Sequence, residues 1–111
     1  MGLFTRWGHR RRARATSPRA EDRAARERTL THFREFVATR KGVEAYVEPA
    51  TANDPVTVVL VATTGEWTRR RVPDAPSGFA LARELGVPAY DVLRTGYPPR
   101  MRRWSSQNRH R

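Results

Sequence analysis

Apolar side chains recur at spacings of three and four residues in one early segment of the chain, formed by Leu30, Phe33, Phe36 and Val37. This spacing is typical of one face of an α-helix. Upstream, Ser17 and Pro18 suit the N-cap and first position of a helix, and Gly42 suits its end. The pattern predicts a helix over residues 18–41, in which only the second half has an apolar face to pack on a core.

Three strands are predicted after this helix. Residues 43–48 alternate between apolar and polar side chains, which is typical of a half-exposed strand. Residues 56–63 are almost continuously apolar and β-branched, which indicates the central and most buried strand. Thr64 and Gly65 form a tight turn, after which residues 66–72 return antiparallel.

The turn sets the register of this predicted hairpin. A two-residue turn pairs Thr63 with Glu66. The pairs that follow are Ala62 with Trp67, Leu60 with Arg69, and Val58 with Arg71. Because arginines occur on both faces of residues 66–72, we interpret this segment as an outer strand with an ordinary exposed edge.

The rest of the apolar pattern predicts a second helix and a fourth strand. A short helical stripe is formed by Phe79, Ala82 and Leu85. It predicts a helix over residues 75–85, ended by Gly86. Residues 89–93 then have the composition of a short strand that returns the chain to its own sheet.

These elements predict a single α+β domain over residues 17–96. Its order is α-β-β-β-α-β, with a mostly antiparallel sheet and the helices on one face. Residues 1–16 lack an apolar period and are dense in like charge, which predicts a disordered basic arm. Residues 97–111 form a basic C-terminal tail, in which a short helix can begin at Pro98 or Pro99.

The charged residues are unevenly distributed along the chain. The chain of 111 residues has 22 basic and 11 acidic side chains, a formal net charge of +11. Residues 1–29 hold nine arginines and three acids, and residues 94–111 hold six arginines and no acid, so each end carries +6. The intervening residues 30–93 sum to −1. The predicted domain is therefore nearly neutral, and the two ends carry the charge.

Composition also excludes several kinds of chemistry. The chain has no cysteine, which excludes disulfides, zinc–thiolate sites and thiol catalysis. Its three histidines have no ligand spacing, so we expect no metal site. The longest apolar stretch, residues 58–62, is far shorter than the roughly 20 residues that span a bilayer, and no signal-peptide pattern follows the first arginines. We expect a cytoplasmic protein without a cofactor.

The acidic residues of the predicted strands do not form a recognisable catalytic set. Glu66, Trp67 and Thr68 lie where nucleases of the same element order carry an acid-x-Lys pair, but the lysine is missing. The lysine cluster of double-stranded-RNA-binding domains, which share part of this order, is missing as well. We interpret Glu44 and Glu48 as solvated strand acids and Glu66 as a polar residue beside a turn, and we expect no enzyme.

Four runs of the sequence resemble a known group of proteins: GVEAYVEP, VVLVATTGEWTRRRV, ELGVPAYDV and GYPPRMRRW. Together they resemble an uncharacterised family of small basic actinobacterial proteins over about residues 28–105. The closing pattern is matched by Gly96, Tyr97, Pro98, Arg100, Met101, Arg102 and Trp104. The resemblance implies a cytosolic protein from a GC-rich genome. Such proteins are sometimes loosely called oxidoreductases, but this chain has no dinucleotide fingerprint or flavin cradle.

The leading hypothesis is a non-catalytic platform that presents two basic arms to nucleic acid, with RNA or a ribonucleoprotein favoured over DNA. The predicted binding residues are Arg10, Arg11, Arg12 and Arg14 in the N-terminal arm and Arg100, Arg102, Arg103 and Trp104 in the C-terminal arm. Arginines neutralise phosphates and release counterions, and a tryptophan stacks on exposed bases. We expect the C-terminal arm to carry the function.

Two further hypotheses stay open. In the first, the arms are solubilising tails, Met101 and Trp104 pack back on the domain, and the partner is a protein. In the second, Leu3, Phe4 and Trp7 beside arginines anchor the chain at an anionic membrane.

Overall fold

A four-stranded sheet in the order β3-β2-β1-β4 forms the centre of the domain. The structure is a computed structural model that describes residues 18–109. Its strands are β1 (Glu44–Glu48), β2 (Thr57–Val61), β3 (Trp67–Arg71) and β4 (Ala89–Asp91). Its helices are α2 (Pro18–Thr39), α3 (Ala75–Leu85), α4 (Val92–Thr95) and α5 (Pro99–Asn108). The predicted disordered arm, residues 1–16, lies outside the described residues.

The strand pairing gives an α+β fold and confirms the predicted class. Strand β1 pairs antiparallel with β2, and β2 pairs antiparallel with β3. Only β4 is parallel to its neighbour, β1, because α3 returns the chain across the sheet before β4 begins. As predicted from its arginines, β3 is an outer strand, and the apolar β2 is an inner one.

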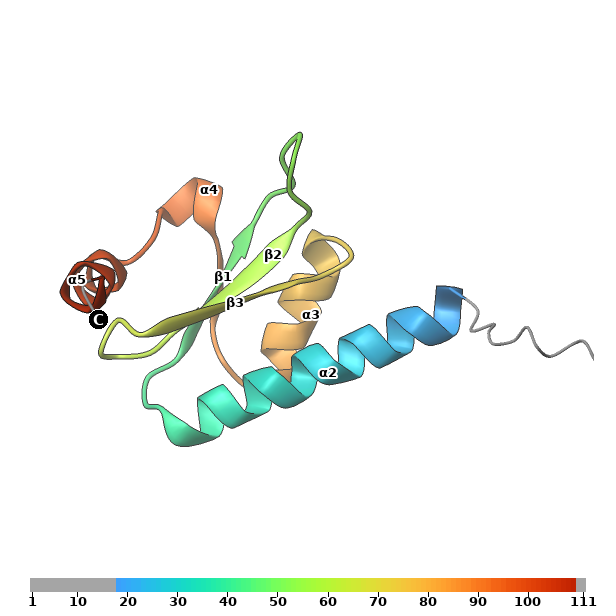
Figure 1. Cartoon of the computed structure of the whole chain (residues 1–111), viewed down its shortest axis with the longest axis horizontal. Helices are drawn as coiled ribbons and strands as arrows, with labels where there is room; N and C mark the ends of the chain where they lie inside the picture. The colour runs from blue at the N-terminus through green and yellow to red at the C-terminus, as the bar shows by residue number, and fades with distance from the viewer. Residues whose placement is uncertain (1–17, 110–111) are drawn as a thin grey trace, which may run out of the picture.

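The two longer helices, α2 and α3, lie together on one face of the sheet (Figure 1). The core beneath them is built from the apolar stripe of α2, including Leu30 and the fully buried Phe33, and from strand residues such as Val58 and Leu60. Each such side chain contributes about 1.5–3 kcal/mol by leaving water. The N-terminal half of α2, which is polar all round, projects beyond the sheet (Figure 1).

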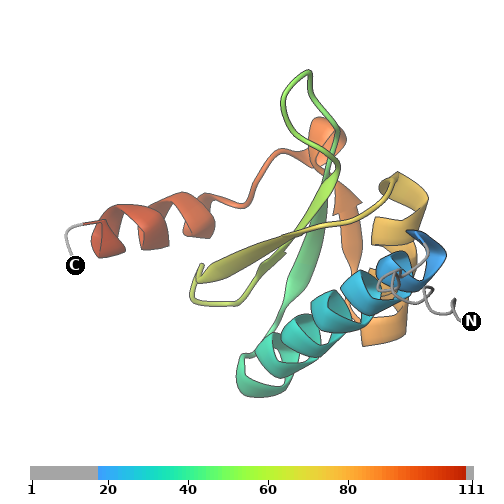
Figure 2. The same ribbon diagram turned by 45° about the vertical axis from the view of Figure 1, so that its right-hand side comes forward.

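The opposite face of the sheet is covered in part by the C-terminal helix α5 (Figure 2). A second apolar cluster lies here, formed by Tyr46, Val59, Val61 and Met101, with Trp67 and Tyr90 packed against it. The predicted arrangement with helices on one face therefore holds for α2 and α3, and α5 adds a cover on the other face.

The register of the β2–β3 hairpin differs from the predicted one by one residue. Val61 pairs with Trp67 and Val59 with Arg69, so the predicted pairs of Ala62 with Trp67 and Leu60 with Arg69 were wrong. The loop has three residues rather than two: the amide of Gly65 donates to Ala62 O at 2.9 Å, and Gly65 adopts a φ of +95°. Glycine at the left-handed third position is typical of such loops.

The fourth strand is shorter than predicted. Strand β4 ends at Asp91, and the segment predicted to continue it to residue 93 turns into the single turn of α4. The reason is local: the carboxylate of Asp91 accepts a hydrogen bond from the amide of Leu93 at 2.9 Å and caps the turn. The chain then leaves the sheet and crosses to α5.

Candidate nucleic-acid interface

Helix α5 carries the charged residues of the C-terminal arm, and one of its faces is fixed to the sheet. Met101 is buried, and the residues three, four and seven positions further, Trp104, Ser105 and Asn108, are half-buried. Such a spacing forms one stripe of a helix. Arg102, Arg103, Ser106 and Gln107 face solvent, whereas Arg100 is half-buried.

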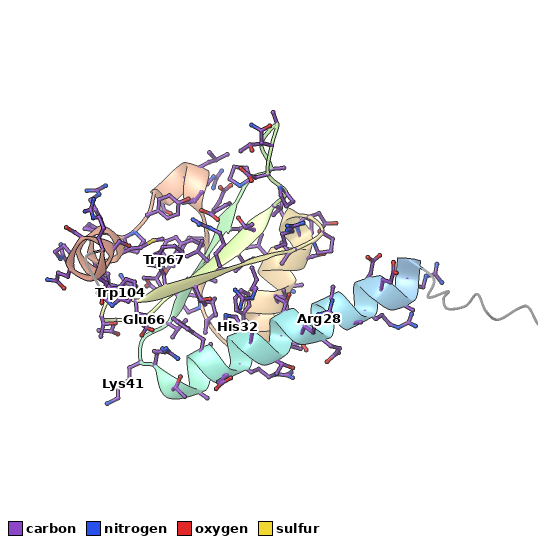
Figure 3. All side chains as sticks on the ribbon, viewed as in Figure 1. Arg28, His32, Lys41, Glu66, Trp67 and Trp104 are labelled. Atoms are coloured by element: carbon purple, nitrogen blue, oxygen red, sulfur yellow. The ribbon has the colours of Figure 1, made fainter. Side chains whose placement is uncertain are left out.

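Hydrogen bonds hold this inner stripe in place. The indole nitrogen of Trp67 donates to Ser105 Oγ at 2.8 Å, which joins β3 to α5. Trp104 lies beside the β2–β3 turn, as Figure 3 also shows, and a Cβ on Gly65 would come within 3.0 Å of the Cβ of Trp104. Trp104 is therefore partly used in packing, and only part of its ring is open for stacking on a base.

Arg100 points into the protein. Its Nε donates to the carbonyl oxygen of Ala62 at 2.9 Å, and its Nη2 donates to Glu44 Oε1 at 2.8 Å. The hydrogen bond from Arg100 lowers the pKa of Glu44, and so does a further bond from the phenol of Tyr46. Burial and the bond to Glu44 raise the pKa of Tyr46 to about 12. The guanidinium of Arg100 thus already binds a carboxylate and a carbonyl oxygen, so it is less available than an exposed arginine for the predicted phosphate contact.

Glu48 is the centre of a second network on the same sheet face. Its carboxylate receives two hydrogen bonds from Arg69, of 2.8 and 2.9 Å, together with bonds from Thr57 and the phenol of Tyr97. Burial raises the pKa of Glu48, but the bonds from Arg69, Thr57 and Tyr97 outweigh it and lower the pKa overall. The side chain of Glu48 is 12% exposed. The interpretation of Glu48 as a solvated acid was therefore wrong, whereas Glu44 stays 30% exposed and is paired with Arg100.

Glu66 also has a structural partner. Its two carboxylate oxygens accept hydrogen bonds from Nε and Nη2 of Arg40, at 3.0 and 2.8 Å. The hydrogen bonds from Arg40 lower the pKa of Glu66. This pair has no local signature in the sequence, because Arg40 directly follows α2 and Glu66 directly precedes β3, 26 residues further along the chain.

These pairings decide where uncompensated charge remains. Glu44, Glu48, Glu66 and Glu84 are each bound to arginine. The outer face of α5 retains its cations: Arg102 and Arg103, followed by Arg109 at the C-cap, are exposed, and none of them forms an ion pair within residues 18–109. The residues beside them on that face, Ser106 and Gln107, are neutral and can donate hydrogen bonds. The projecting half of α2 is also rich in arginine, but acidic residues lie between its arginines.

The structure thus divides the predicted binding residues. Arg102 and Arg103 lie on the open face of α5, Trp104 lies at its border, and Arg100 lies inside. The residues of the N-terminal arm, Arg10, Arg11, Arg12 and Arg14, lie outside the described residues. The sequence analysis did not assign Glu44, Glu48 or Arg69 to a site. The available signal was that two acids, Glu44 and Glu48, lie on the same face of one predicted strand. The matching arginines lie in another predicted strand and in the tail.

Two further features were looked for in the described part of the chain: metal-binding clusters and membrane-spanning helices. Between residues 18 and 109, no group of three or more His, Asp or Glu side chains is placed to hold a metal ion. No helix in that range is long and apolar enough to cross a membrane. In comparisons with protein-family models, curated proteins and solved structures, no match to this chain was found.

Proposed function

We propose that the protein binds nucleic acid, RNA in particular, through the outer face of α5. The observation that carries this proposal is a helix fixed to the sheet by its inner stripe while its outer face presents arginines and no acid. A preformed helix loses little conformational entropy when its side chains meet phosphates. Arginine also forms two parallel hydrogen bonds to a phosphate, which lysine does not.

Binding through this face is independent of base sequence. Arg102, Arg103 and Arg109 supply phosphate contacts, and Gln107 is the only amide on the exposed face that can read a base edge. The half-buried ring of Trp104 supplies at most one stacking contact at the border of the face. Arginines of the N-terminal arm would add phosphate contacts of the same kind.

The test measures binding of a fluorescently labelled RNA of mixed sequence by full-length protein over a series of salt concentrations. In the double variant Arg102→Ala/Arg103→Ala, the negative slope of log K against log salt becomes shallower by about 1.4. Each lost phosphate contact removes about 0.7 from its magnitude for a single strand. The matched control is Arg83→Ala/Arg94→Ala, which removes the same charge from exposed positions on α3 and α4.

The control makes the result decisive. If both double variants lose the same affinity, binding follows net charge alone and the α5 interface is wrong. Substituting alanine for Arg10, Arg11, Arg12 and Arg14 measures the N-terminal arm separately. Anionic vesicles tested in parallel address the membrane alternative, and vesicle binding without RNA binding contradicts the proposal.

A further inference from the structure

A cavity of about 690 Å³ lies between the β1–β2 loop, the end of β3 and the segment that joins β4 to α5. Its wall contains Glu48 and Arg69, whose mutual hydrogen bonds are described above, and Arg71 two residues further along β3. Its volume is within the range of about 300–1,000 Å³ that is typical of sites for small molecules. This cavity is separate from the outer face of α5, which contributes no residue to its lining.

Exposed apolar surface is concentrated at this cavity. Within the described residues, the large hydrophobic side chains that remain exposed are Leu93 and Tyr97, at 75% and 46%. Both line the cavity, although they lie on opposite sides of Gly96 in a short crossing segment. Exposed apolar side chains gathered at a concave surface mark a binding site more often than isolated ones do.

The polar groups of the cavity are fixed before any ligand arrives. The carboxylate of Glu48 accepts four hydrogen bonds. One of them comes from the phenol of Tyr97 and holds the aromatic ring in position. Arg69 is in turn neutralised by Glu48 and lies over the ring of Trp67 at 5.0 Å. Neither Glu48 nor Arg69 therefore needs a charged ligand.

Arg71 is different, because it is exposed and forms no ion pair or side-chain hydrogen bond within residues 18–109. One other acid lines the cavity, Asp54 in the β1–β2 loop, whose Oδ2 lies 3.5 Å from Thr51 Oγ1. Asp54 is exposed and is not paired with Arg71. The free guanidinium of Arg71 is thus the group in this cavity that lacks a partner.

We propose that the cavity binds a small organic anion whose apolar or aromatic body packs on Tyr97 and Leu93 and whose acidic group pairs with Arg71. Apolar contact on one side and a fork of N–H donors on the other fit a carboxylate, sulfonate or phosphate monoester attached to a ring. An inorganic anion lacks the apolar part, and a neutral aromatic compound lacks the partner for Arg71.

The test uses phenyl phosphate, inorganic phosphate and benzyl alcohol as probes, titrated into ¹⁵N-labelled full-length protein and followed by amide chemical shifts. Phenyl phosphate is expected to bind most tightly, with shifts centred on Thr57, Arg71, Leu93 and Tyr97. Arg71→Gln weakens that binding about fivefold or more, since it removes a charge-assisted hydrogen bond. Leu93→Ser, at an exposed position, weakens it about threefold.

Two control variants keep the test specific. Arg83→Gln removes an exposed arginine from α3 and changes the affinity less than about twofold, as expected for a screened distant charge. Asp54→Asn removes a repelling carboxylate from the cavity and increases affinity. The proposal is overturned if inorganic phosphate binds as well as phenyl phosphate, if Arg83→Gln matches Arg71→Gln, or if the shifts are spread over arginines outside the cavity.

Discussion

Arg100 of α5 and Glu44 of β1, 56 residues apart in the chain, form an ion pair of 2.8 Å between Nη2 and Oε1. The two side chains are 25% and 30% exposed, and Arg100 also satisfies the carbonyl of Ala62. A charge-assisted hydrogen bond that is partly shielded from water is stronger than a surface pair. The C-terminal arm is therefore part of the fold as well as a carrier of charge.

This pair predicts that two arginines close together on α5 differ in their effect on stability. Arg100→Ala removes the partner of Glu44 and of Ala62 O, and we expect the free energy of unfolding to fall by about 1–3 kcal/mol. Arg102→Ala changes an exposed arginine on the same helix and should remain within about 0.5 kcal/mol of the wild type. Urea denaturation of both variants measures the difference. Equal stabilities would show that the contacts of Arg100 are not energetically important.

A second prediction concerns the close approach of α5 to the β2–β3 turn. In Gly65→Ala, the new Cβ would lie 2.1 Å from the carbonyl oxygen of Arg100, in addition to the cost of a positive φ. Gly86→Ala meets only that conformational cost, of about 1–2 kcal/mol, because no heavy atom lies within 4 Å of its Cβ. Gly65→Ala is expected to lose more stability and to increase amide hydrogen exchange in α5. The idea fails if both variants lose stability equally and α5 exchanges as in the wild type.

Acid should weaken the sheet face under α5. The pKa values of Glu44 and Glu48 lie below the ordinary value of 4.5. For Glu44 the main cause is the hydrogen bond from Arg100; for Glu48 burial raises the pKa, but the bonds from Arg69, Thr57 and Tyr97 together outweigh it. The folded state then binds fewer protons than the unfolded state, so this stabilisation is complete above about pH 4.5 and is lost as the pH falls through the folded values.

Glu48→Gln tests this origin of the acid dependence. The variant is expected to be less stable than the wild type at pH 7 and to lose less stability than the wild type below pH 4.5. Burial, followed by the charge of Arg70, lowers the pKa of His32, so His32 contributes a separate loss that begins below pH 6.5. Chemical denaturation between pH 3 and 7 separates the two ranges. An unchanged slope below pH 4.5 in Glu48→Gln would contradict the role of Glu48.

The sequence was sufficient for the class and order of the fold because its apolar periods are strong. The stripe from Leu30 to Val37 and the β-branched run of β2 each allow one secondary structure, and arginines on both faces indicated an outer strand. The hairpin register was wrong because Thr64 and Gly65 suit a two-residue turn, whereas the structure adds Thr63 to the loop. One residue of slip moves every side chain to the other face.

That slip explains why the candidate site was only partly predicted. With the observed register, Trp67, Arg69 and Arg71 share a face with Glu44, Tyr46 and Glu48, where α5 and Tyr97 cover the sheet. An acid paired with an arginine 21 or 56 residues away has no local signature. The sequence therefore indicated the cations of the C-terminal arm only as a group and could not separate Arg100, which packs inside, from Arg102 and Arg103, which face solvent.

Deleting residues 99–111 is expected to lower the stability of the domain more than the removal of its positive charges alone would lower it. Helix α5 covers Val59, Val61 and Trp67 through Met101, and removing a buried methionine side chain alone costs about 2–5 kcal/mol. The shortened protein should melt at a lower temperature and bind a hydrophobic dye on the uncovered sheet face. Deleting only residues 109–111 removes two arginines but leaves α5 intact, and should change the melting temperature little. If the longer deletion melts like the shorter one, α5 does not stabilise the sheet, and the fixed geometry assigned to its outer face is wrong.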